Sequence, residues 1–336
     1  MGFHLPLIFA ILSLAAVALA NHAAQPAPQL YWNSVLPNTQ MPRSISELLH
    51  PDPTNEEKSK PEIFPLANKH YLQKGYGKGG KPVQKGYGKG GKPVQKGYGK
   101  RSPPSDNQLL HYKELAIFFF EKDMRPGATM KFQFPRNSNT ATFLPRESAQ
   151  SIPFSSNKLP EIFNHFSVKP TSVEATTIKE TIEECEAPGI KGEEKYCATS
   201  LESMVDFSTS KLGTRNVEAI STEVLERGAT MSMHNYTTMP GLKKLAGDKV
   251  VVCHKENYPY AVFFCHAIKQ TAAYVLSLKG DDGEKVKAVT ICHLDTSEWN
   301  PEHLSFQILN VKPGTVPICH FISTDAIAWV PKHKSA

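Results

Sequence analysis

The sequence predicts a mostly β, α+β domain of short strands and few helices, bonded by disulfides and preceded by a disordered repeat region. Three observations support this prediction. All six cysteines lie between residues 185 and 319. Short runs of β-forming residues precede four of them, and such runs are typical of buried strands. Residues 69–101 consist largely of Gly, Lys and Tyr, a composition that builds no apolar core.

Residues 1–20 have the features of a secretory signal peptide. An apolar run from Leu7 to Leu19 overlaps the small-residue site Ala18-Leu19-Ala20, so we expect cleavage before Asn21. The run is too short for a membrane span, which needs about 20 apolar residues, and no later stretch is long enough. We therefore expect a secreted protein with no membrane segment after cleavage.

Residues 21–68 are rich in Pro and polar residues, with a single apolar patch from Tyr31 to Leu36. Such a composition buries too little apolar surface to offset the entropy lost when the chain is ordered. We therefore expect this segment to be largely disordered, with a brief helix over residues 44–50.

Residues 69–101 contain an 11-residue repeat. The unit Gln73–Val83 recurs unchanged as Gln84–Val94 and begins a third time at Gln95. A unit with four glycines and a proline has no apolar face with which to stack, and this excludes a solenoid. The pattern predicts a flexible, cationic, repeated peptide.

The positive charge of the chain is concentrated in these repeats. Residues 69–101 carry ten Lys or Arg and no acidic residue. Taking these ten from the total of 38 leaves 28 basic against 32 acidic residues, a balance of −4 against the formal +6 of the whole chain. The basicity is therefore local, and nothing indicates a nucleic-acid-binding domain.

Regular structure is expected from about residue 111 to residue 331. Leu115–Phe120 is an apolar run long enough for a buried strand, and Lys131–Phe134 alternates as a half-exposed strand does. Residues 137–160 are rich in Ser, Asn and Pro, which predicts a loop.

The second half of this domain is predicted to consist mainly of short strands. Residues 200–212 are the exception, because they suit a helix that ends at Gly213. The predicted strands cover residues 250–253, 261–265, 274–278, 286–292 and 327–330.

Two weak similarities within the sequence are compatible with an internal duplication. Gly127–Met130 has the same sequence as Gly228–Met231. Cys185 and Cys197 are separated by eleven residues, and so are Cys253 and Cys265. A duplicated β-rich unit explains both similarities, and chance or similar turn chemistry explains them nearly as well.

Four of the six cysteines are followed directly by histidine, far more often than random placement would give. The pairs are Cys253-His254, Cys265-His266, Cys292-His293 and Cys319-His320. β-forming residues stand before each pair, and neighbouring side chains on a strand point to opposite faces. We therefore expect the sulfurs on one face of the sheet and the imidazoles on the other.

Three interpretations of these pairs are open. In the first, the cysteines form disulfides and the histidines bind a metal, for which neutral imidazole is a suitable ligand. In the second, Cys and His together hold structural zinc, although zinc fingers use shorter spacings and secretion oxidises thiols. In the third, the histidines only end strands. Four histidines in matched frames favour the first.

An even number of cysteines in an exported protein favours disulfides, and the pairing cannot be read from the sequence. The candidate disulfide cysteines are Cys185, Cys197, Cys253, Cys265, Cys292 and Cys319. Asn235-Tyr236-Thr237 is the one N-glycosylation sequon, which makes Asn235 the candidate for a surface glycan.

The spacing CH-x10-CH-x25-CH-x25-CH resembles the pattern of the plant BURP-domain family. Four further segments are similar to segments of that family. They are Phe118-Phe119-Phe120, Ser297 to His303, Ala326 to Pro331 and, upstream, Tyr31 to Thr39. The resemblance covers the chain except the repeats, and it implies one BURP domain over residues 111–331.

The resemblance implies two kinds of function. Some members resemble stress-induced, seed or cell-wall proteins. Others are copper-dependent peptide cyclases, which crosslink a Tyr or Trp side chain of a core peptide to a nearby carbon. In such cyclases the histidines of the Cys-His pairs resemble the copper ligands and the cysteines form disulfides. Carried over, the implied copper ligands are His254, His266, His293 and His320, with His303 as a weaker candidate.

The repeats have features of a core peptide for such a cyclase. Each unit is flexible and has one oxidisable aromatic residue flanked by glycines, namely Tyr76, Tyr87 and Tyr98. The acceptor carbon would lie on the Lys or Gln that precedes each tyrosine, because the intervening glycine has no Cβ. We therefore predict that the chain's own repeats are the substrate of its copper site.

The alternative is a noncatalytic protein of the apoplast or cell wall, or of the vacuole by the same secretory route. The cationic repeats would then bind pectin carboxylates, and wall peroxidases would couple the exposed tyrosines. A hydrolase has little support, because the sequence has no nucleophile elbow, zinc-protease motif or phosphate loop.

Overall fold

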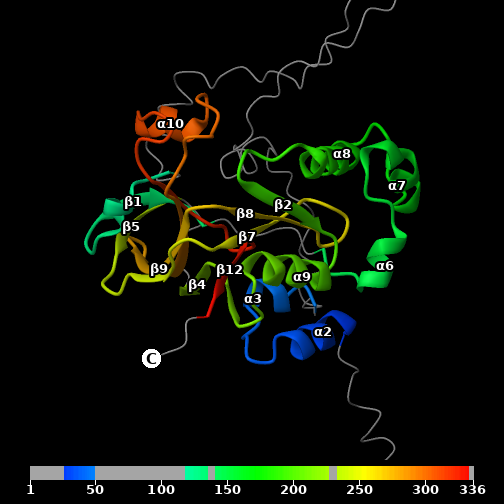
Figure 1. Ribbon diagram of the computed structural model, residues 1–336, viewed down its shortest axis with the longest axis horizontal. Helices are drawn as coiled ribbons and strands as arrows, with labels where there is room; N and C mark the ends of the chain where they lie inside the picture. Colours follow the sequence, from blue (N-terminus) through cyan, green and yellow to red (C-terminus); the bar gives the residue numbers. More distant parts are fainter. Residues whose placement is uncertain (1–25, 50–117, 135–140, 227–232, 333–336) are drawn as a thin grey trace, which may run out of the picture.

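The computed structural model describes residues 26–49, 118–134, 141–226 and 233–332, which form two antiparallel sheets with helices around them (Figure 1). The expected signal peptide and the repeats with Tyr76, Tyr87 and Tyr98 lie outside the described residues. Within the described ranges, no helix is long and apolar enough to cross a membrane.

The first sheet has seven strands around a long central hairpin of β9 and β10. Its main path runs β1-β5-β9-β10-β11, with β6 also paired to β9 and β4 to β10. The strands are β1 (Thr129–Phe132), β4 (Glu223–Glu226), β5 (His234–Thr238), β6 (Lys243–Ala246), β9 (Thr271–Gly280), β10 (Lys285–His293) and β11 (Ile318–Phe321).

The second sheet has five strands in the order β2-β8-β7-β12-β3. The strands are β2 (Glu193–Ala198), β3 (Val217–Ile220), β7 (Val251–Lys255), β8 (Phe263–Ile268) and β12 (Ile327–Pro331). In β7 every residue is buried, which is typical of a strand covered on both faces.

The two sheets pack on each other through a shared apolar cluster. Val252 on β7 and Ala328 on β12 contribute from the second sheet, and Ala273 on β9 and Ile291 on β10 contribute from the first. These side chains alternate along their strands with side chains of the opposite faces. The cluster therefore forms the inner layer of a sandwich, and the histidines of β7 and β10 fall in the same layer.

Helix α9 (Leu201–Leu212) covers the outer face of the second sheet. Ser200 caps its N-terminus by accepting a hydrogen bond from the Ser203 amide, and Gly213 ends it with φ of 71°. Only residues that tolerate the left-handed region end a helix in this way without strain. The predicted helix over residues 200–212 is confirmed, including its end.

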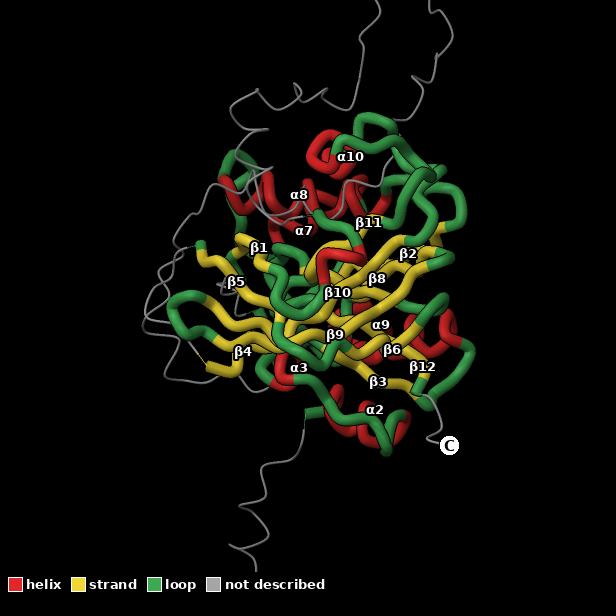
Figure 2. The backbone as a smooth tube through the Cα atoms, turned by 90° about the vertical axis from the view of Figure 1, so that its left-hand side faces the viewer, coloured by secondary structure: helices red, strands yellow, loops and turns green. Residues whose placement is uncertain are grey.

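The other helices lie at the edges of the sandwich. Three of them, α6, α7 and α8, pack in one cluster on Tyr258, Tyr260 and Val262. Figure 2 shows α2 and α3 at one end of the molecule and α10 at the other. The bounds are α2 (Ala27–Val35), α3 (Arg43–Ser46), η2 (Glu121–Met124), α6 (Arg146–Ser151), η3 (Ser156–Lys158), α7 (Leu159–His165), α8 (Val173–Glu186) and α10 (Leu304–Leu309).

The segment 26–49 is ordered on the domain, so the expectation of disorder was wrong for these residues. Trp32 of α2 is buried, and its ring lies 5.5 Å from that of Trp329 on β12. Trp32 Nε1 donates to the Thr39 carbonyl at 3.1 Å, and the Thr39 hydroxyl donates to the Val217 carbonyl at 2.8 Å. The average composition of residues 21–68 concealed this local apolar face.

Two other local predictions need correction. Phe119 makes one bridge with Cys319 and is not part of a strand over the described part of residues 115–120. The predicted loop over residues 137–160 contains α6, whose Ala149 is buried. Helix α6 is stabilised by its packing on α9 and near Tyr258, and this tertiary packing cannot be predicted from the local sequence. The strands predicted from residue 250 onward are confirmed as β7 to β10 and β12.

Three disulfides join Cys185 to Cys197, Cys253 to Cys265 and Cys292 to Cys319. The first joins α8 to β2, whereas the second joins two paired strands. The equal spacing of these two pairs therefore has a different structural origin in each. The second copy of Gly-Ala-Thr-Met lies outside the described residues.

We expect Trp32→Ala to lower the free energy of unfolding by about 3–5 kcal/mol, because it empties a buried indole site between α2 and β12. Urea denaturation of the disulfide-intact protein measures this change. Leu30→Ala on the same helix is the matched control: Leu30 is 53% exposed and Trp32 is 2% exposed. Equal midpoints for the two variants would show that α2 does not dock.

Candidate metal centre

The four Cys-His pairs lie on two pairs of neighbouring strands. Cys253 on β7 stands directly opposite Cys265 on β8, and Cys292 on β10 stands directly opposite Cys319 on β11. Both pairs are disulfides. The first sulfur pair faces α9 and the second faces the Phe119 and Phe321 cluster. Each disulfide therefore points away from the layer between the sheets.

The histidines occupy the opposite face, as strand alternation predicts. The rings of His254 and His266 lie 5.4 Å apart between centroids. The rings of His293 and His320 stack at a similar centroid distance of 5.5 Å, and their Nε2 atoms lie 3.4 Å apart. The expected separation of sulfurs and imidazoles is confirmed for both strand pairs.

The two histidine pairs meet between the sheets. Burial lowers the pKa of His293 well below its usual value, and the neighbouring rings of His320, His266 and His303 lower it further. Burial also lowers the pKa of His320 to about 4, a hydrogen bond to the Phe321 carbonyl opposes this, and His266 adds to it. At neutral pH both rings are therefore uncharged, which is the state that binds metal ions.

Hydrogen bonds on the Nδ1 side orient three of the rings. His266 Nδ1 donates to Glu193 Oε1 at 2.9 Å, and His320 Nδ1 donates to the Phe321 carbonyl at 3.1 Å. His293 Nδ1 lies 3.5 Å from the Thr271 hydroxyl. Such partners on one ring nitrogen direct the lone pair of the other nitrogen, here Nε2, toward a metal.

Glu193 is a buried carboxylate that belongs to this arrangement. Burial raises the pKa of Glu193, but the hydrogen bond and charge of His266, the Ile190 amide and Lys195 outweigh it, so the net pKa is lowered. The Ile190 amide donates to its second oxygen at 3.0 Å. No local sequence pattern singles out Glu193, because only the pairing of β2 with β8 brings it to His266.

His303 joins the cluster from the N-terminus of α10. Its Nδ1 accepts hydrogen bonds from the Ser305 amide at 3.1 Å and the Ser305 hydroxyl at 2.7 Å. Burial and the nearby His320 lower the pKa of His303 to about 3. His303, the weaker candidate, therefore lies beside His293 and His320.

Aromatic side chains close the cluster. The Trp299 ring lies 5.0 Å from His293 and 4.8 Å from His303, and the Phe118 ring lies 5.6 Å from His303. Together with Phe306 and Ile318 they form an apolar cap. This cap excludes water and strengthens electrostatic interactions inside it.

The donor set fits a metal that prefers imidazole. Bonds of about 2.0–2.1 Å from one ion to two tetrahedral nitrogen ligands place those nitrogens roughly 3.3–3.4 Å apart. His293 Nε2 and His320 Nε2 have this separation, at 3.4 Å. Imidazole suits copper, zinc, iron and nickel. The role of the four histidines as ligands stays a prediction, and the ligand spacing supports it for the pair His293 and His320. Among the described residues, no three histidines of this cluster bring one ring nitrogen each within 4.8 Å of the others.

The expected glycosylation site lies at the surface, as attachment of a glycan requires. Asn235 lies on β5 with its side chain exposed, and Nδ2 donates to Asp281 Oδ2 at 3.2 Å. The modification itself stays a prediction.

Comparison with known proteins agrees with this pattern of strands and pairs. The BURP domain family model matches residues 117–331. BURP domain protein RD22 of Arabidopsis thaliana is 39% identical over 397 residues, covering 98% of this chain and 99% of that protein. BURP domain-containing protein 5 of Oryza sativa subsp. japonica is 41% identical over 317 residues, covering 94% and 90%.

A third relative matches about two thirds of the chain. BURP domain-containing protein 3 of Oryza sativa subsp. japonica is 50% identical over 228 residues, covering 67% of this chain and 53% of that protein. The matched region contains all the cysteines and all the histidines of the cluster described above. The chain therefore belongs to the plant BURP-domain family.

Proposed function

We propose that this protein is a secreted, copper-dependent oxidative peptide cyclase that crosslinks the tyrosines of its own repeats. The observation that carries the proposal is the close approach of two buried, uncharged histidines, with His293 Nε2 and His320 Nε2 at 3.4 Å. Copper bound there supplies a one-electron oxidant for a phenol, with dioxygen as the final electron acceptor.

The residues around the cluster have defined tasks in this proposal. His254, His266, His293 and His320 hold the metal, with His303 beside them. Glu193 keeps His266 in the tautomer whose Nε2 points inward. Trp299 and Phe118 keep bulk water from the rings.

The reaction balances as a two-electron oxidation of the repeat. The tyrosine side chain and a carbon of the preceding Lys or Gln each lose one hydrogen, and a bond forms between them. The two electrons and two protons pass to dioxygen. The substrate residues are Tyr76, Tyr87 and Tyr98.

The connectivity of the chain favours an intramolecular reaction. The repeats lie between two segments that are both fixed to the domain. Upstream, α2 packs on α9 and β12; downstream, Phe119 pairs with Cys319 beside His320. Tethering at both ends holds a peptide near the domain at an effective concentration on the order of millimolar.

A noncatalytic cell-wall protein is the second candidate. The burial of the rings favours it, because His293 and His320 are each only 2% exposed and offer no surface to a peptide. In that case the metal would only stabilise the sandwich. The ten cationic residues of residues 69–101 would bind pectin carboxylates.

We expect the oxidised protein to bind copper and His293→Gln to abolish most of that binding. Glu193→Gln removes only the partner of His266, so its copper affinity is expected to fall by about 10–100-fold. Equilibrium dialysis with elemental analysis measures both. His165→Gln is the matched control, because His165 is exposed on α7, away from the cluster. Wild-type protein that holds no copper would contradict the proposed centre.

For the crosslinking reaction, we expect the mature protein with Cu(II) and air to lose two hydrogens from each modified repeat. Tandem mass spectrometry should place the change within a Gln-Lys-Gly-Tyr segment. Replacing Tyr76, Tyr87 and Tyr98 together with Phe should abolish the change and leave the bound copper unaltered. Unchanged repeat masses in copper-loaded wild type would rule out the cyclase.

For the wall-binding alternative, we expect retention on pectin that weakens as salt rises, because salt screens exposed charges. Deleting residues 69–101 should remove the retention and leave the folded domain intact. If the deleted protein is retained as strongly as the whole chain, the repeats do not bind the polymer.

A further inference from the structure

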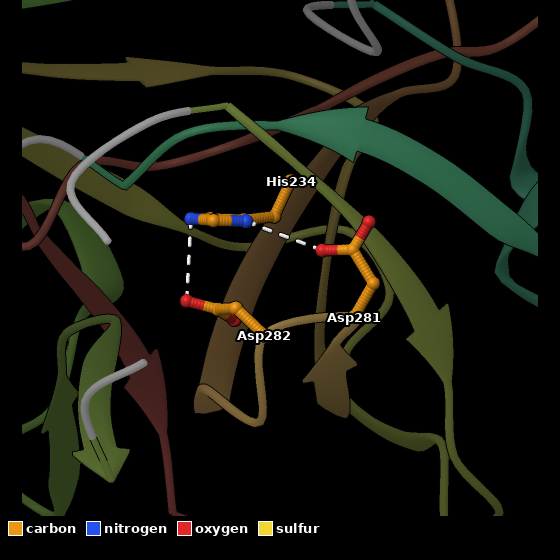
Figure 3. A group of neighbouring side chains, drawn as sticks. All are labelled: His234, Asp281 and Asp282. Carbon is orange, nitrogen blue, oxygen red and sulfur yellow. Dashed lines mark hydrogen bonds and ion pairs between the residues drawn. The ribbon is translucent and has the colours of Figure 1, made fainter. Parts of the chain in front are cut away.

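A second group of metal-ligating side chains lies away from the histidine cluster, in the first sheet (Figure 3). His234 is the first residue of β5, and Asp281 and Asp282 lie in the turn between β9 and β10. Among the described residues, these three are the only His, Cys, Asp or Glu set with one ligand atom from each within 4.8 Å of the others.

The two carboxylates approach opposite edges of the imidazole (Figure 3). Asp281 Oδ1 lies 3.2 Å from Nδ1, and Asp282 Oδ2 lies 3.3 Å from Nε2. The side chain of His234 is 8% exposed and that of Asp282 is 9% exposed, whereas Asp281 is 53% exposed. The ring therefore stands between one carboxylate near solvent and one that is buried.

The buried carboxylate has an unsatisfied oxygen. Asp282 Oδ1 accepts a hydrogen bond from the Glu284 amide at 3.0 Å. Asp282 Oδ2 is shielded from solvent and accepts no hydrogen bond, although His234 Nε2 is 3.3 Å away. A buried carboxylate oxygen without a hydrogen bond is costly, and a bound ion is one of the few ways to compensate it.

Backbone contacts hold the three side chains in place. The Asp281 amide donates to the Asn235 carbonyl at 3.0 Å, which ties the turn to β5. The Gly280 amide donates to the Glu284 carbonyl at 2.7 Å, and Gly283 has φ of 93°, which favours glycine. The site is therefore assembled by the β5, β9 and β10 pairing, before any ligand binds.

A third acidic residue lies close to the two aspartates. Glu284 follows the two aspartates, and the Tyr236 hydroxyl donates to its carboxylate. Burial raises the pKa of Tyr236, and Glu284, Asp282 and Asp281 raise it further. Asp281 Oδ2 accepts from Asn235 at 3.2 Å, so its other oxygen faces the ring. A divalent cation would neutralise the two aspartates.

We propose that His234 Nε2 and the Asp282 carboxylate bind a divalent transition-metal ion of the zinc type, oriented by Asp281 through Nδ1. A carboxylate that accepts from Nδ1 fixes the tautomer whose Nε2 lone pair faces the ion. The 3.3 Å between Nε2 and Asp282 Oδ2 is the separation of two ligands on one tetrahedral zinc, with bonds of about 2.0–2.2 Å. Water completes the coordination.

The ion would join the first strand position of β5 to the β9–β10 turn. This site is independent of the copper proposal, because its ligands come from other residues and include carboxylate oxygen. The competing explanation is a protonated His234 that forms an ion pair with each aspartate and needs no metal.

Zinc alone is the probe, used with the full, disulfide-bonded chain. Equilibrium dialysis with elemental analysis counts bound zinc, and thermal unfolding with and without zinc reports its effect on the fold. Asp282→Asn removes the ligand charge and keeps the shape and the acceptor for the Glu284 amide. Asp248→Asn is the matched control, because Asp248 is exposed in a turn away from the site.

We expect Asp282→Asn to bind one zinc ion fewer than wild type, with affinity at this site at least about 100-fold lower, and Asp281→Asn to weaken it by about 10–100-fold. Zinc should raise the unfolding temperature of wild type and Asp248→Asn more than that of Asp282→Asn. Equal zinc content and equal shifts in wild type and Asp282→Asn would overturn the site. A lower unfolding temperature of metal-free Asp282→Asn with no zinc response in either protein would instead establish the ion pair.

Discussion

The pairing of cysteines that stand directly opposite each other is the constraint on which the histidine cluster depends. In β7 with β8 and in β10 with β11, a disulfide joins opposed positions and so prevents the strands from slipping. A slip of one residue would turn every side chain to the other face. The imidazole that follows each cysteine is therefore held on the inner face, where the other sheet meets it.

The sandwich then determines the chemistry of those rings. Because the aromatic cap covers the end of the inner layer, His293 and His320 lie in a dry environment and stay neutral. The site around His234 differs in each respect. It lies at a turn, it combines one imidazole with two carboxylates, and one of these carboxylates is half exposed. The two sites therefore suit ions of different preference.

Much of this arrangement could be predicted from local sequence, and the rest depends on contacts between distant residues. The β-forming runs before His254, His266, His293 and His320 predicted the strands and the separation of the rings from the sulfurs, but not which of the two faces points inward. Glu193 could not be found, because its role arises from the pairing of β2 with β8. Likewise, the burial of Trp32 depends on distant residues such as Trp329, which is almost the whole chain away in the sequence. In the sequence, Asp281 and Asp282 do not differ from ordinary turn residues. Only the pairing of β5 with β9 brings His234 next to them.

The docked helix α2 has a consequence for how the repeat region can vary in length. Because Trp32 on one side and Phe119 on the other are fixed to the same domain, the intervening chain is a closed loop whose span does not depend on how many units it holds. The entropic free-energy cost of closing a flexible loop rises only with the logarithm of the loop's length, by about 0.6 kcal/mol for each doubling. Gain or loss of whole units should thus leave the folded domain almost as stable as before.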